Sequence, residues 1–120
     1  MSGKMRRVSE ILVRLYAADT AGCDPEAELL VQQATCDIEL ALVAVGFTHR
    51  PKANERLSLA GAMQDTDGFS GLLGQLSDAS ESHGGSGMDQ AKHLLRRAEV
   101  TLRIAQHRHF QNMHPLARRQ

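Results

Sequence analysis

The chain has 120 residues, of which 42% are hydrophobic and 23% are charged, and its formal net charge is zero. This composition is typical of one small globular domain. No apolar run reaches the roughly 18 residues that a membrane-spanning helix needs, and the first ten residues lack the apolar segment of a signal peptide. We therefore expect an intracellular protein of the cytoplasm or nucleus that does not enter a membrane.

Residues 5–20 form the first predicted helix, and Gly22 is its expected stop. Aromatic residues make up only 3% of the chain, so aliphatic side chains must fill the core. One apolar stripe recurs at helical spacing in this helix. It consists of Met5, Val8, Leu12, Leu15 and Tyr16.

The second predicted helix has the clearest start signal in the chain and should extend to Val45. Asp24 is placed to cap the free N–H groups, Pro25 suits the first helical position, and Gly46 is a typical stop. Residues 38–45 are apolar nearly all round, which predicts a central helix covered on more than one side. The main apolar face consists of Ala27, Leu30, Ala34, Ile38, Ala41 and Val45.

The middle of the chain predicts two shorter helices. Residues 48–53 are expected to form a loop because Pro51 resists helix continuation, and a short helix should follow over residues 55–64. Residues 77–87 are rich in Ser and Gly and are predicted to be mobile. Before them we expect Asp67 to cap a helix with apolar positions at Phe69, Leu72, Leu73 and Leu76.

The last predicted helix begins at Asp89 and extends to about Met113. Val100 and Ile104 make a narrow apolar face that should meet water or a partner. The opposite, wider face should pack against the core. It gathers Leu95, Ala98, Leu102, Ala105 and His109.

Charge is divided unevenly along the chain. Residues 1–83 carry seven Lys or Arg against twelve Asp or Glu, a net charge of −5, whereas residues 84–120 carry seven against two, a net charge of +5. Surfaces of opposite charge attract each other. Asp37 lies close to the apolar face of its helix. A buried carboxylate needs a partner, so we expect Asp37 to reach the edge of the core or to pair with an arginine.

The stretch Gly84-Gly85-Ser86-Gly87, followed by Met88, separates the acidic and basic parts. Its composition joins chains without imposing structure, as in deliberately fused proteins, and natural Gly/Ser loops share it. The predicted organisation is a helical binding domain (1–83), a flexible linker of natural or engineered origin (84–87), and a helical partner segment with a basic tail (88–120).

These elements predict an all-α bundle of four to five helices, in which the long C-terminal helix packs on the N-terminal helices. No nucleotide loop, nucleophile elbow or carboxylate pair occurs, so we expect neither an enzyme nor a cofactor. The predicted function is protein–protein interaction, in which the acidic domain binds a basic amphipathic helix of a partner, or of residues 88–120, in a groove. The expected contacts are Leu95, Ala98, Leu102 and Ala105 against Leu30, Ile38, Val45, Leu72 and Leu76.

Six histidines suggest a metal site, but their spacing opposes it. Ligands on one helix face must be three or four residues apart, whereas His107 and His109 are two apart. We therefore expect no metal site. About twelve residues of helix, roughly 18 Å, separate Cys23 from Cys36. This is too far for a disulfide, so both are expected to be free thiols.

The stretch His93-Leu94-Leu95-Arg96-Arg97-Ala98 supports an alternative. It resembles the phosphorylated motif of histidine-phosphotransfer domains, which are four-helix bundles of similar length. The resemblance covers only these positions and implies that an exposed His93 accepts a phosphoryl group. The family has a glycine where Arg97 stands, and Arg97 would crowd a docking receiver domain.

Nucleic-acid binding is a further alternative, because seven basic residues follow residue 91. They are spaced around the helix rather than along one stripe, and Phe110 is the only aromatic residue there that could stack on bases. A solvated basic face beside an acidic neighbour accounts better for this pattern. Protein is therefore the favoured partner.

Overall fold

The computed structural model describes residues 2–47, 58–64, 66–81 and 88–113, and within these it contains five helices and no strand. The all-α class predicted from the sequence is thereby confirmed. An isolated bridge joins Asp19 to Ser58 and ties the α1–α2 connection to the start of α3. The helices are α1 (Ser2–Tyr16), α2 (Pro25–Ala44), α3 (Leu59–Gln64), α4 (Thr66–Ser80) and α5 (Met88–Met113).

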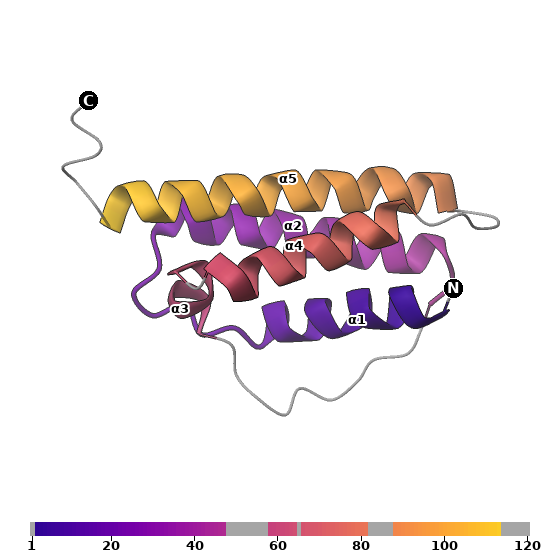
Figure 1. Ribbon diagram of the computed structural model, residues 1–120, viewed down its shortest axis with the longest axis horizontal. Helices are drawn as coiled ribbons and strands as arrows, with labels where there is room; N and C mark the ends of the chain where they lie inside the picture. The colour runs from indigo at the N-terminus through magenta and orange to yellow at the C-terminus, as the bar shows by residue number, and fades with distance from the viewer. Residues whose placement is uncertain (1, 48–57, 65, 82–87, 114–120) are drawn as a thin grey trace.

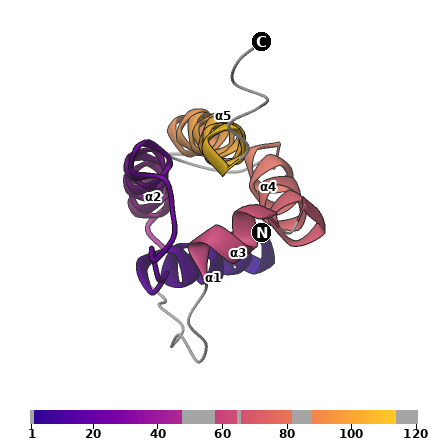
Figure 2. The ribbon, with the colours of Figure 1, turned by 90° about the vertical axis from the view of Figure 1, so that its left-hand side faces the viewer.

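Four long helices surround one core, and α3 lies across one end of it (Figure 1, Figure 2). Around the bundle the order is α1, α2, α5, α4, so α1 lies diagonal to α5 and α2 lies diagonal to α4. Each long helix is antiparallel to both of its neighbours (Figure 1). The arrangement is that of a four-helix bundle, with dimensions of 48 × 31 × 22 Å.

The boundaries of α2 follow from local chemistry. The Asp24 side chain accepts a hydrogen bond from the Ala27 N–H at 3.0 Å, and Pro25 occupies the first turn. At the other end Val45 is the C-cap, and Gly46 adopts a positive φ of 71° that a residue with a side chain would rarely tolerate. The predicted start and stop of this helix are confirmed.

The core is largely aliphatic, and Phe69 is the one aromatic side chain buried in the described part of the chain. Ile11, which the helical spacing places at the edge of the α1 stripe, is also buried. Tyr16 was expected in that stripe but is 56% exposed, and its hydroxyl donates to Glu39 of α2. Tyr16 is the last residue of α1, so its phenol reaches the surface and finds a polar partner there.

Helix α4 is longer than the sequence predicted. Residues 77–80, expected to be mobile, form its last turn, and Ala79 and Ser80 are buried. The Ser80 hydroxyl donates to the Ser77 carbonyl at 2.7 Å, so its polar group is satisfied within the helix. Alanine is the strongest helix former, and burial of Ser80 against the bundle overrides the weaker helix preference of serine.

Several predicted segments fall outside the described residues. These are the loop over residues 48–53, the first part of the helix over residues 55–64, and the linker at residues 84–87. The remainder of the predicted 55–64 helix is α3, which begins at Leu59.

Helix α2 is covered on two sides, by α1 and α5, but the prediction that it is central is wrong. Leu40 is 54% exposed and Val43 is 66% exposed, both on the side of the helix that faces away from the bundle. The reason is geometric: four long helices around one core place each of them at a corner, and α2 has only α1 and α5 as neighbours.

Candidate helix-recognition interface between α2 and α5

Helix α5 lies antiparallel to α2 along most of its length, and the two form the most extensive helix pair in the described structure. Two ion pairs fix their register: Asp37 with Arg97, and Glu26 with Arg108. The two acids are eleven residues apart on α2, and the two arginines are eleven residues apart on α5. Equal spacing on both helices means that they remain in register between the pairs.

The buried side of α5 has a seven-residue repeat, the spacing of close helix–helix packing. Every member of the repeat that follows is at most 4% exposed. One row consists of Met88, Leu95, Leu102 and His109, and the other consists of Ala91, Ala98 and Ala105.

Helix α2 has a matching row of fully buried alanines, Ala27, Ala34 and Ala41. Because Asp37 reaches Arg97, the alanines one turn to either side of Asp37 also turn toward α5. Small side chains on both helices allow the axes to approach to the shorter end of the usual separation of about 8–10 Å. Each alanine row can be read from the sequence of its own helix, but the opposition of the two rows cannot, because periodicity within one helix does not reveal its neighbour.

Most of the expected contact residues share the buried core. Leu30 and Val45 are only half-buried and pack against its edge. Val31 and Leu42 of α2 were not among the expected contact residues, yet both are buried. The expected residues that are buried in the common cluster are Ile38, Leu72, Leu76, Leu95, Ala98, Leu102 and Ala105.

The Asp37–Arg97 pair is a two-point contact. Arg97 Nε donates to Asp37 Oδ2 at 2.9 Å, and Nη2 donates to Oδ1 at 2.6 Å. The Asp37 side chain is 11% exposed, whereas the Arg97 side chain is 56% exposed. Hydrogen bonds to the carboxylate, and then its negative charge, raise the pKa of Arg97. The expected pairing of Asp37 with an arginine is confirmed.

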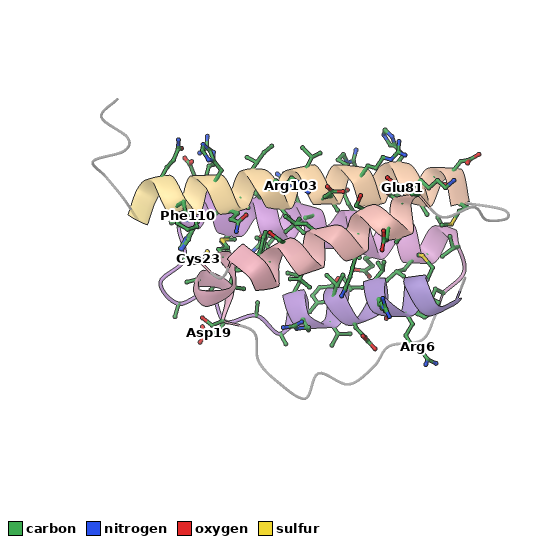
Figure 3. All side chains as sticks on the ribbon, viewed as in Figure 1. Arg6, Asp19, Cys23, Glu81, Arg103 and Phe110 are labelled. Atoms are coloured by element: carbon green, nitrogen blue, oxygen red, sulfur yellow. The ribbon has the colours of Figure 1, made fainter. Side chains whose placement is uncertain are left out.

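At the C-terminal end of α5 the interface becomes polar. The backbone N–H of Asp24 donates to His109 Nδ1 at 3.4 Å, and Gln106 Nε2 donates to the Met63 carbonyl of α3 at 2.9 Å. His109 is fully buried, and its Nε2 has no hydrogen-bond partner in the described structure. Cys23 and Phe110 lie at this same end of the bundle, beside α3 (Figure 3).

The cysteines are free, as expected. Cys23 is half-buried and Cys36 is exposed. Burial, followed by the negative charges of Glu28 and Asp24, raises the pKa of the Cys23 thiol.

Much of the positive charge of α5 is already engaged within the chain. Arg97 and Arg108 pair with acids of α2, and Arg103 pairs with Glu99 one turn earlier at 3.0 Å. Arg103 lies on α5 in Figure 3. Such pairing reduces the charge that these three arginines can offer to a phosphate backbone.

His93 is exposed on α5, which meets the condition of the phosphotransfer alternative. Its neighbour one turn later, Arg97, is held by Asp37. Among the described residues, no three His, Cys, Asp or Glu side chains gather closely enough to bind a metal ion. No helix in this part of the chain is long and apolar enough to cross a membrane.

Comparison of the chain with protein-family models, curated proteins and solved structures found no match.

Proposed function

We propose that the chain is a non-catalytic protein-recognition module, in which an acidic helical domain (residues 1–83) binds a basic amphipathic helix (within residues 88–120) in a groove. The observation that carries the proposal is the distribution of charge in the two α2–α5 ion pairs. In both of them the acid belongs to the domain and the arginine belongs to α5.

Burial along α5 supports the same proposal. Leu95 and Leu102 are at most 1% exposed, and truncating buried leucines typically costs about 2–5 kcal/mol. Apolar residues buried in a groove supply affinity, and charged pairs at its rim supply orientation and partner choice. The α5 segment contains both, and the opposite net charges of the two parts match this division.

The experiment replaces residues 84–87 with a protease site and cleaves the folded protein there. We expect the fragment with α5 to stay bound after cleavage and to exchange with an excess of fluorescent peptide covering residues 88–120. A peptide with Leu102→Glu should fail to exchange, because that side chain is buried. The matched control is Val100→Glu, at a position 55% exposed, which should exchange normally.

The opposite result would be unfolding of residues 1–83 after cleavage with no recovery when the peptide is added. It would identify one indivisible five-helix domain and end the recognition proposal. Circular dichroism of the cleaved sample at low and high peptide concentration separates these outcomes.

Phosphoryl transfer through His93 is the second candidate, supported by the exposure of that side chain. Incubation with an acyl phosphate donor should then give an acid-labile phosphorylated chain, and His93→Gln should abolish it. His107→Gln, at another exposed histidine on α5, is the control. Lack of labelling in the unchanged chain would end this alternative.

A further inference from the structure

Helix α1 has 15 residues and its neighbour α2 has 20, and the difference leaves a cavity beside α2. Tyr16 is the last residue of α1, and its hydroxyl donates to Glu39 of α2. The two helices are antiparallel, so the part of α2 before Glu39 extends past the end of α1 toward α3 (Figure 1). The space beyond the end of α1 is a cavity of about 350 Å³.

The cavity is lined by the end of α1, the α1–α2 connection, one side of α2 and the start of α3. Leu15 of α1 and Leu59, the first residue of α3, lie on the side opposite α2. Leu59 is held there because its N–H donates to the Asp19 carbonyl at 3.0 Å. The lining residues of α2 have the spacing of one helix face. They are Glu28, Val31, Gln32, Thr35 and Cys36.

The size and the lining of the cavity suit a small organic molecule. Ligand pockets usually enclose about 300–1,000 Å³, and an apolar cavity of about 150 Å³ is enough to bind benzene. Leu15, Val31 and Leu59 are buried side chains that supply apolar surface to the lining. A ligand body made of one small ring or a short alkyl chain therefore has room between them.

The polar atoms of the lining favour a ligand that donates hydrogen bonds. The Thr35 hydroxyl donates to the Val31 carbonyl at 2.7 Å. The Tyr16 hydroxyl donates to Glu39, so neither hydroxyl hydrogen is left for a ligand. Glu28 is the one charged side chain among the described residues of the lining, and a carboxylate only accepts. An ammonium group carries three donors and no acceptor, so it complements this set in both charge and hydrogen bonding.

We propose that this cavity binds a small primary amine, with its apolar body against Leu15, Val31 and Leu59 and its ammonium group against Glu28. Glu28 is half-buried and forms no ion pair with the described part of the chain. Hydrogen bonds between two charged groups are roughly twice as strong as neutral ones. Among the described residues, none from α5 lines the cavity, so the site is separate from the proposed helix recognition.

The first test compares three probes that share one apolar body and differ in the head group: phenethylamine, phenethyl alcohol and phenylacetate. Binding to the isotope-labelled full-length chain is followed by NMR titration. We expect the amine to bind with a Kd about tenfold lower than that of the alcohol, because it adds a charge-assisted hydrogen bond. Phenylacetate should bind more weakly than either, because it meets the like charge of Glu28. Equal affinity for the amine and the alcohol, or no saturable binding of the amine, overturns the proposal.

The second test removes the carboxylate. Glu28→Gln should raise the Kd for phenethylamine about tenfold and leave the Kd for phenethyl alcohol nearly unchanged. Glu26→Gln is the matched control, because it removes another acid from the first turn of α2 at a residue outside the cavity. Thermal unfolding of both variants shows that they are folded. An unchanged Kd for the amine in Glu28→Gln contradicts the assignment of Glu28.

The third test uses the unchanged chain. Cys36 is exposed and lines the cavity, whereas Cys23 lies outside it. Saturating phenethylamine should slow the alkylation of Cys36 by iodoacetamide severalfold and should not slow that of Cys23, as measured by mass spectrometry of digested peptides. Equal rates at Cys36 with and without the amine would place the amine elsewhere and overturn the proposal. Because these readouts come from α2 and not from exchange of α5, their failure is distinguishable from failure of the helix-recognition proposal.

Discussion

Asp37 and Arg97 form a two-point ion pair that joins the acidic and the basic part of the chain, with the carboxylate buried and the guanidinium largely in water. Removing one partner therefore has a different consequence from removing the other, because the partner that remains is either buried or in water. An unpaired buried carboxylate is costly, whereas an unpaired exposed arginine is solvated.

Arg97→Ala should therefore destabilise the protein more than Asp37→Ala. We expect the free energy of unfolding to fall for Arg97→Ala, because a buried polar group is left unsatisfied, and to fall by less for Asp37→Ala. Urea unfolding followed by circular dichroism measures both. Arg96→Ala, at an exposed arginine beside the pair, is the control and should have little effect. The reverse order of the first two variants would contradict the assignment.

The alanine rows make a second prediction about the same interface. Ala98→Leu should lower the free energy of unfolding by about 1–3 kcal/mol, because the larger side chain forces apart two closely packed helices. Val100→Leu enlarges an exposed residue two positions away and should be nearly neutral. If Ala98→Leu were tolerated equally well in a thermal melt, the helices would not be closely packed at this point.

Local signals in the sequence were enough to place the helices and most of the core. The cap at Asp24, the stop at Gly46 and the apolar spacing of Phe69, Leu72 and Leu76 each act within one helix, and the structure confirms them. The pairing of Asp37 with an arginine was also predicted, but its identity as Arg97 was not. That choice depends on which helices are neighbours, which no single segment specifies.

The error about α2 has the same origin. Residues 38–45 are apolar nearly all round, and a central position in the bundle was the natural interpretation. Only the arrangement of four helices shows that Leu40 and Val43 are left on the outside. An apolar helix face therefore predicts a contact but does not reveal whether that contact lies within the chain or with another molecule.

The two thiols should differ in reactivity. Thiolate is the reactive form, and the raised pKa and partial burial of Cys23 reduce its thiolate fraction and access. Cys36 is exposed and should be alkylated first at neutral pH, with the order read by mass spectrometry of digested peptides. Faster alkylation of Cys23 would contradict this assignment.

The raised pKa of Cys23 also predicts how the stability of the fold changes at alkaline pH. The folded chain binds the thiol proton more tightly than the unfolded chain, so its contribution is fully present below the unfolded pKa, near 9.0. It is lost as pH rises from there through the folded pKa. Cys23→Ser should therefore unfold with a weaker dependence on pH above about 9, and urea titration at a series of pH values measures it.

His109 occupies a position of the α5 repeat where Leu95 and Leu102 precede it, and this suggests a stabilising substitution. It is fully buried, its Nε2 has no partner in the described structure, and its one hydrogen bond from the Asp24 N–H is long at 3.4 Å. In a neutral ring whose Nδ1 accepts, Nε2 carries the proton, so a donor is left unsatisfied.

We expect His109→Leu to raise the free energy of unfolding by about 1 kcal/mol, because it removes the unsatisfied donor and continues the apolar row. His107→Leu, on the exposed side of the same helix, should not raise it and controls for the general effect of leucine in a helix. Differential scanning calorimetry of the three chains measures the change. A clear loss of stability in His109→Leu would mean that the contact with Asp24 outweighs the unsatisfied donor, and that the histidine anchors the start of α2 to the end of α5.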